Sequence, residues 1–132
     1  MQLKWDTGYE KGIPQMDKNH REFITLVNQL QDCSDGDLHR RLSKLVDHTR
    51  EHFAQEDRWM DETGFPPIKI HVNEHKRVIH MLDGALKMAQ QGEFGSTREA
   101  VDRLRDWFDH HAESMDNALA LHLKYSNYQP AH

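Results

Sequence analysis

The stretch DLHRRLSKLVDHTREHFAQEDRWMDE, residues 37–62, decides the fold of this chain. Its apolar side chains recur every three or four residues, which is the period of a helix with one buried face. Asp37 is a residue type that caps helices, no proline interrupts the stretch, and Gly64 lies just beyond its end. The predicted buried face consists of Leu38, Leu42, Leu45, Thr49, His52, Glu56 and Met60.

Three further stretches show the same spacing, and short polar breaks with glycine or proline separate them. The first is expected to run from about Asp17, as its N-cap, to about Cys33. The third is expected to begin after the two prolines at 66–67, because proline suits the first turn of a helix. The fourth opens with a capping-box pattern at residues 96–99.

Four helices of this kind predict an all-α fold, an up-down-up-down four-helix bundle formed by residues 17–123. Residues 1–16 are expected to form an N-terminal arm, and the length of 132 residues fits a single domain over 1–132. The side chains of the arm that are expected to pack against the bundle are Trp5, Tyr9, Ile13 and Met16.

Charge and composition exclude several classes of protein. The net charge of −5 argues against a partner made of nucleic acid, which requires a basic surface. No apolar run approaches the ~18 residues needed to span a membrane, and no secretory signal is visible, so a cytoplasmic location is expected. The single cysteine, Cys33, excludes an internal disulfide and a cysteine-rich zinc site. A monomer is expected for this size and charge.

Histidine is unusually frequent, with 11 residues against three tyrosines and three tryptophans. The position of each histidine around its helix separates two groups. One group shares a face with charged residues or lies at a chain or helix end, and is expected to be solvated or structural. Its members are His39, His48, His80, His110, His122 and His132.

The other group falls on the predicted apolar faces of all four helices, and it consists of His20, His52, Glu56, His71, His75 and His111. A buried polar group without a partner costs about 1–3 kcal/mol, so a small bundle can hold six of them only if something compensates. Because helices alternate in direction in such a bundle, all six residues are expected at one level. A metal centre there would satisfy them together.

Spacing supports this interpretation. Two pairs, His52 with Glu56 and His71 with His75, are four residues apart, so each pair projects side by side from its helix. Asp116 follows His111 by five residues and adds a second carboxylate. Five imidazoles and two carboxylates exceed the four ligands of a zinc ion and suit two ions about 3.5–4 Å apart. Ligands without thiolate favour iron or manganese, and iron is the expected metal.

The motifs around these residues resemble those of the bacteriohemerythrins, the single-domain prokaryotic form of the hemerythrin family. The resemblance spans most of the chain, and four segments carry it in order: WDTGYEKGIPQMDKNH at 5–20, HFAQE at 52–56, HVNEH at 71–75 and HAESMD at 111–116. The last three match the H-x-x-x-E, H-x-x-x-H and H-x-x-x-x-D patterns of the family.

The resemblance implies a role for each ligand. One iron ion would be held by His71, His75 and His111, and the other by His20 and His52. Glu56 and Asp116 would bridge the two ions together with an oxo or hydroxo group. O2 would bind reversibly at the two-histidine iron, in an apolar pocket whose candidate lining residues are Phe23, Ile24, Leu45, Thr49, Met60 and Met115.

Three functions remain open at this point. The leading one is reversible O2 binding for transport, storage or delivery, without enzymatic activity. The first alternative is a sensor of O2 or redox state that acts through a separate partner. The second is a di-iron enzyme that acts on peroxide or nitric oxide. O2 itself is the expected ligand, and neither nucleic acid nor a membrane is an expected partner.

Overall fold

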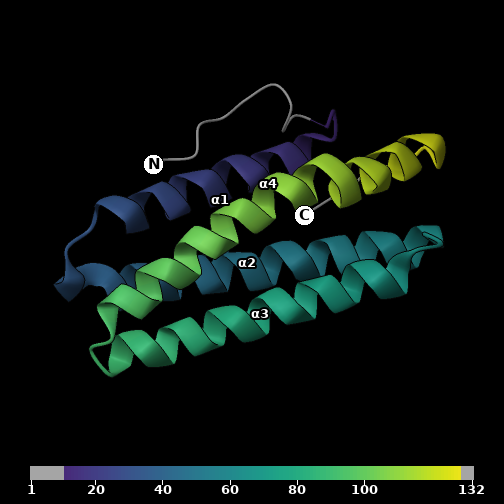
Figure 1. Ribbon diagram of the computed structural model, residues 1–132. Coiled ribbons are helices and arrows are strands. Elements are labelled where there is room, and N and C mark those ends of the chain that lie inside the picture. The colour runs from purple at the N-terminus through teal and green to yellow at the C-terminus, as the bar shows by residue number, and fades with distance from the viewer. Residues whose placement is uncertain (1–10, 129–132) are drawn as a thin grey trace.

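A computed structural model describes residues 11–128, apart from the side chains of residues 112 and 113. Within this range the chain forms four helices and no strand: α1 (Pro14–Asp32), α2 (Asp35–Thr63), α3 (Ile68–Gln90) and α4 (Phe94–Tyr125). Successive helices run in opposite directions and lie side by side (Figure 1). The predicted all-α, up-down-up-down bundle is therefore confirmed.

The start of α1 differs from the prediction. The helix begins at Pro14, so Asp17 is not its N-cap, and the last three residues of the predicted 1–16 arm are helical. Proline is favoured in the first turn because its missing N–H would have no partner there. Asp17 lies buried inside the helix, and its carboxylate accepts the backbone N–H groups of Lys11 at 2.8 Å and Gly12 at 3.2 Å. The carboxylate therefore anchors the segment that leads into α1.

Two other helices also begin earlier than predicted. In α2 the N-cap is Ser34, and the helix starts two residues before Asp37. The capping box predicted at 96–99 is wrong, because α4 already begins at Phe94, whose side chain packs against the core. Thr97 donates its hydroxyl to the carbonyl oxygen of Glu93 at 2.8 Å, as an internal helical residue does.

The break between α2 and α3 follows the prediction. Gly64 adopts a left-handed conformation with φ of 65°, which glycine reaches without a steric penalty, and it ends α2. The following Phe65 returns its N–H to the carbonyl of Met60. Helix α3 begins directly after Pro67.

The buried apolar side chains form two clusters. The larger cluster fills the bundle on one side of the predicted metal level, and on α2 it ends at Phe53. The smaller cluster begins on α2 at Trp59 and includes Ile13 and Met16, the two described residues of the predicted arm contacts. Polar residues of all four helices lie between these two clusters. Apolar side chains therefore border the predicted metal level both above and below it along the bundle axis.

Some of the predictions fall on residues that the structure does not describe. The predicted arm contacts of Trp5 and Tyr9 lie outside residues 11–128, as does His132. Of the helices within the described range, none has the length and apolar character needed to cross a membrane.

Candidate metal centre

The structure brings the seven predicted ligand residues together. Each is buried, with no more than 4% of its surface exposed, and each of the four helices contributes at least one of them. They are His20 on α1, His52 and Glu56 on α2, His71 and His75 on α3, and His111 and Asp116 on α4. They converge because successive helices run in opposite directions. In that arrangement the polar positions on the buried face of each helix lie at the same level of the bundle.

Glu56 lies in the middle of the cluster, and its two carboxylate oxygens face different histidines. Its Oε1 is 3.2 Å from His75 Nε2 and 3.5 Å from His71 Nε2. Its Oε2 is 2.7 Å from His52 Nε2 and 3.8 Å from His20 Nε2. One carboxylate group thus divides the cluster between the imidazoles of α3 and those of α1 and α2.

The carboxylate of Asp116, on α4, also has its two oxygens facing different histidines. Its Oδ1 is 2.8 Å from His111 Nε2 and 3.3 Å from His71 Nε2. Its Oδ2 is 3.1 Å from His20 Nε2. Both carboxylates therefore present one oxygen to His71 and its neighbours and the other oxygen to His20.

These short distances are mostly not hydrogen bonds. Among the pairs just given, only His52 Nε2 and Glu56 Oε2 meet hydrogen-bond geometry. The remaining facing atoms are buried and find no hydrogen-bond partner within the described part of the chain: Nε2 of His20, His71, His75 and His111, Oε1 of Glu56 and both oxygens of Asp116. Imidazole nitrogens and carboxylate oxygens left in this way are suitable ligands for a metal ion. The residues present therefore fit a metal centre.

The donor atoms fall into two groups that share Glu56. One group is Glu56 with His71, His75 and His111, and the other is Glu56 with His20 and His52; within each group one donor atom per residue lies within 4.8 Å of the others. We call the imidazoles of the first group the three-histidine half and those of the second the two-histidine half.

The buried carboxylates change the protonation of the histidines when no metal is bound. Burial alone lowers the pKa of His20, but Asp116 and Glu56 outweigh it and raise the pKa to about 9. The same balance raises the pKa of His71 to about 10. Although burial favours a neutral Glu56, the surrounding histidines, His52 foremost, hold its pKa well below the usual range. A metal ion must therefore displace protons from the cluster as it binds.

Residues 11–122 match the protein family described as the hemerythrin HHE cation binding domain. The chain belongs to the hemerythrin family. The matched range includes every one of the seven clustered side chains, so the family match and the geometry concern the same part of the molecule.

Individual hemerythrins resemble this chain over most of its length. It is 33% identical over 117 residues to a bacteriohemerythrin of Ralstonia nicotianae, which covers 89% of this chain and 85% of that protein. A bacteriohemerythrin of Stenotrophomonas maltophilia is 30% identical over 129 residues, or 92% and 82% of the two chains. Myohemerythrin-1 of Phascolopsis gouldii is 26% identical over 113 residues, or 85% and 87%. The predicted family resemblance is confirmed.

The predicted apolar lining of this hemerythrin site is buried except at one position. Phe23, Ile24, Leu45, Thr49 and Met60 are buried, whereas Met115 is half-buried. Phe108, which the sequence reasoning did not select, lies edge-on to the ring of His20 with ring centres 5.4 Å apart. It also stacks on Phe23 at 4.6 Å, so a buried pair of aromatic rings begins at His20 of the two-histidine half.

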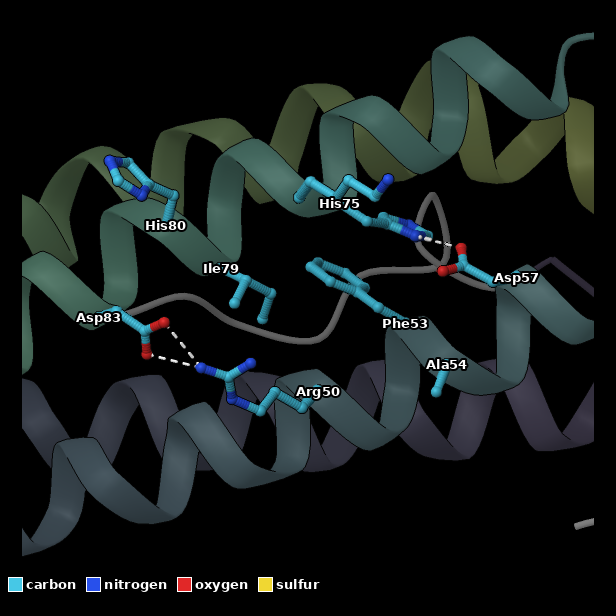
Figure 2. A pocket seen from close by; sticks show the side chains of 9 residues that line it. Arg50, Phe53, Ala54, Asp57, His75, Ile79, His80 and Asp83 are labelled. Carbon is cyan, nitrogen blue, oxygen red and sulfur yellow. Dashed lines mark hydrogen bonds and ion pairs between the residues drawn. The ribbon is translucent and has the colours of Figure 1, made fainter.

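Contacts behind the ligands of the three-histidine half were also missed. The ring of Phe53 stacks on His75 at 3.9 Å, and Asp57 forms a hydrogen bond with His75 Nδ1 at 2.8 Å (Figure 2). Trp107 stacks on His111 at 4.3 Å, and its indole N–H donates to Glu74 at 2.6 Å. The contacts of Phe53, Asp57 and Glu74 join neighbouring helices, so no spacing within one helix could have indicated them. The stack of Trp107 on His111 is a contact between residues four apart on α4, a spacing that the sequence does show.

The described histidines that were predicted outside the cluster, a set without His132, lie outside it, and two of them are more buried than predicted. His80 and His110 are exposed, and His122 forms a hydrogen bond with the carbonyl oxygen of Thr63 at 3.0 Å. His39 is half-buried. The solvated position predicted for His48 is wrong, because only 16% of its side chain is exposed and Glu22 of α1 lies 3.5 Å away.

Proposed function

We propose that this hemerythrin is a non-heme di-iron protein that binds O2 reversibly for transport, storage or delivery. In this proposal the three-histidine half holds one iron ion and the two-histidine half holds the other. Glu56 and Asp116 would supply carboxylate ligands to both ions, and an oxo or hydroxo group would complete the centre. The chain is taken to act as one domain and as a monomer.

The division of both carboxylates is the observation that carries the proposal. Glu56 and Asp116 each direct one oxygen to the three-histidine half and the other to His20. A single ion would not need two carboxylates turned in this way, whereas two adjacent ions are held by bridges of this kind. Imidazole and carboxylate ligands without thiolate favour iron.

When bound, the iron pair supplies the electrons for reversible O2 binding. The protein determines where a small ligand can bind, because the two-histidine half offers one imidazole fewer and an ion there would have one protein ligand fewer. Phe108 lies against His20 and stacks on Phe23, and both rings are buried, so water has little access from that side. A dry environment of this kind disfavours the proton transfer and charge separation that accompany irreversible oxidation.

Repeated cycles of oxygenation test the proposal. The protein is reconstituted anaerobically with ferrous iron, and its visible spectrum is followed while O2 is added and removed several times. We expect a charge-transfer band that appears with O2 and disappears on its removal. Immediate and permanent conversion to the ferric form would contradict reversible binding and favour the sensor or the enzyme.

The metal assignment is tested separately with a matched pair of histidines on α3. We expect His75→Ala to reduce bound iron well below the wild-type content, because it removes a ligand of the three-histidine half. His80→Ala serves as the control, because His80 is exposed on the same helix. Iron content is measured after desalting, and an equal loss in both variants would contradict the assignment.

A further inference from the structure

We infer that Asp57 is a positioning residue of the metal centre, which orients the ring of His75 and thereby strengthens metal binding by the three-histidine half. The inference rests on the ligand assignment of the proposed function and extends it to a residue that contacts no metal position itself. It also predicts that the two metal positions differ in affinity, with the three-histidine half the stronger.

The contact between Asp57 and His75 determines which nitrogen of the ring carries the proton. Asp57 Oδ1 lies 2.8 Å from His75 Nδ1, so a proton on Nδ1 is donated to the carboxylate. His75 Nε2 faces Glu56 at 3.2 Å and has no hydrogen-bond partner. In the neutral ring, which is the form that binds a metal ion, the lone pair is then on Nε2 and is directed into the cluster. A carboxylate in this outer position fixes the orientation of a ligating histidine and increases its basicity.

Other candidate ligands lack such a partner. The Nδ1 atoms of His20, His52 and His111 are buried and have no hydrogen-bond partner among residues 11–128. Both imidazoles of the two-histidine half are therefore without an orienting carboxylate. The hydrogen bond from His75 to Asp57 therefore distinguishes the three-histidine half from the two-histidine half.

Helix α2 constrains the ring of His75 in two ways. Phe53 lies parallel to the imidazole, with ring centres 3.9 Å apart and planes inclined by 6°. Asp57 follows Phe53 by one helical turn and contacts the edge of the same ring (Figure 2). The aromatic ring limits tilting and the carboxylate limits rotation, so the direction of Nε2 is set before a metal ion arrives.

The surroundings of Asp57 make it suitable for substitution. Its side chain is 37% exposed at the edge of a pocket of about 400 Å³ between α2 and α3, so an isosteric change leaves the core packing intact. Asp83 lines the same pocket and is 44% exposed, but both of its oxygens accept hydrogen bonds from Arg50 at 2.7 Å. Asp83→Asn is therefore a control that removes a carboxylate from the pocket without touching His75.

The experiment is a titration of the metal-free protein with Co²⁺, followed by its visible absorption in the presence of a competing chelator. We expect two binding steps for the wild type. Asp57→Asn should weaken the tighter step about 10–100-fold, the usual effect of losing such an outer contact. The weaker step should change much less. Asp57→Glu should restore part of the affinity, and Asp83→Asn should match the wild type.

The other outcomes separate this inference from the proposed function. A single step, or none, in the wild type would overturn the two-ion assignment and this inference with it. Two wild-type steps that Asp57→Asn leaves in place would overturn only the role of Asp57. A general loss of structure in Asp57→Asn, seen as reduced helical circular dichroism, would also count against a positioning role. In the Zn²⁺-loaded wild type, we expect a downfield NMR signal from the proton on His75 Nδ1, and its absence would overturn the inference independently of any variant.

Discussion

The two halves of the candidate metal centre share the same carboxylates but have different surroundings. Polar and aromatic groups support the three-histidine half from outside: Asp57 contacts His75, and Trp107 stacks on His111. Pockets of about 400 Å³ and about 250 Å³ border His75 and His71, respectively. Among the described side chains, no carboxylate contacts the Nδ1 atoms of the two-histidine half, and buried Phe108 lies against it.

This difference indicates that the two halves would differ in how firmly they hold an ion and in which ligands they admit. A ligand whose ring is held by an outer hydrogen bond loses little freedom when it binds metal, so it favours retention of the ion. A half enclosed by apolar rings favours a small uncharged ligand over water and ions. Under the proposed function, we therefore expect the three-histidine half to retain its ion more firmly and the two-histidine half to be the one that exchanges a ligand.

The largest effect is expected from Glu56, which belongs to both halves. Because its two oxygens face different halves, Glu56→Gln removes a charge and a bridge from both positions at once. We expect almost complete loss of bound iron, measured after anaerobic reconstitution and desalting. The exposed Glu51 on the same helix provides the control Glu51→Gln. If Glu56→Gln loses the metal of one half only, the carboxylate is not shared.

A smaller but still large effect is expected from Phe108, which covers the two-histidine half. Its ring is 1% exposed, and Phe108→Ala should destabilise the fold by about 3–5 kcal/mol in urea unfolding, as cavities of this size do. The loaded variant should also oxidise irreversibly faster, because water reaches the site.

Trp107→Phe is the matched change on the other half. It keeps a ring against His111 and removes the indole hydrogen bond to Glu74, at a cost of about 0.5–1.5 kcal/mol. Its oxidation rate should stay close to that of the wild type. Similar acceleration in both variants would show that the two-histidine half is not specially protected.

A further expected effect is a pH dependence of stability that occurs only without metal. In the folded protein the pKa of His20 is raised from 6.5 to about 9 and that of His71 to about 10. A raised histidine pKa contributes stability that is fully present below pH 6.5 and is lost as the pH rises through the folded value. We therefore expect the Tm of the metal-free protein to fall between pH 6.5 and 10. The iron-loaded protein should show no such fall, since metal replaces the protons, and a shared fall would place the titration elsewhere.

The bundle could be predicted from sequence because each helix carries a long apolar face with unambiguous breaks. The stretch at 37–62 holds more than five turns of consistent pattern, so an error of two residues at its start does not alter which side chains face inward. Helix starts were less predictable. Asp17 and the pattern at 96–99 have the residue types of caps, but a proline at 14 and an apolar side chain at 94 extend both helices beyond them.

The cluster of seven side chains was predictable because its members interrupt the apolar faces of the helices. Charged or imidazole side chains on an apolar face conflict with burial, and this conflict is visible in a single sequence. The outer contacts create no such conflict. Asp57 and Trp107 are half-buried residues whose hydrogen-bond partners lie on α3, and these hydrogen bonds depend on how the helices are rotated against one another.

Gas uptake by the iron-loaded protein tests the central claim most directly. A ferrous protein prepared without oxygen is exposed to a known amount of O2 and then deoxygenated, and both uptake and release are measured with an electrode. A pair of iron ions acting as one site predicts about one O2 taken up for every two iron ions and recovered on deoxygenation. Uptake without release, or one O2 for each iron ion, would contradict a di-iron centre that binds O2 reversibly.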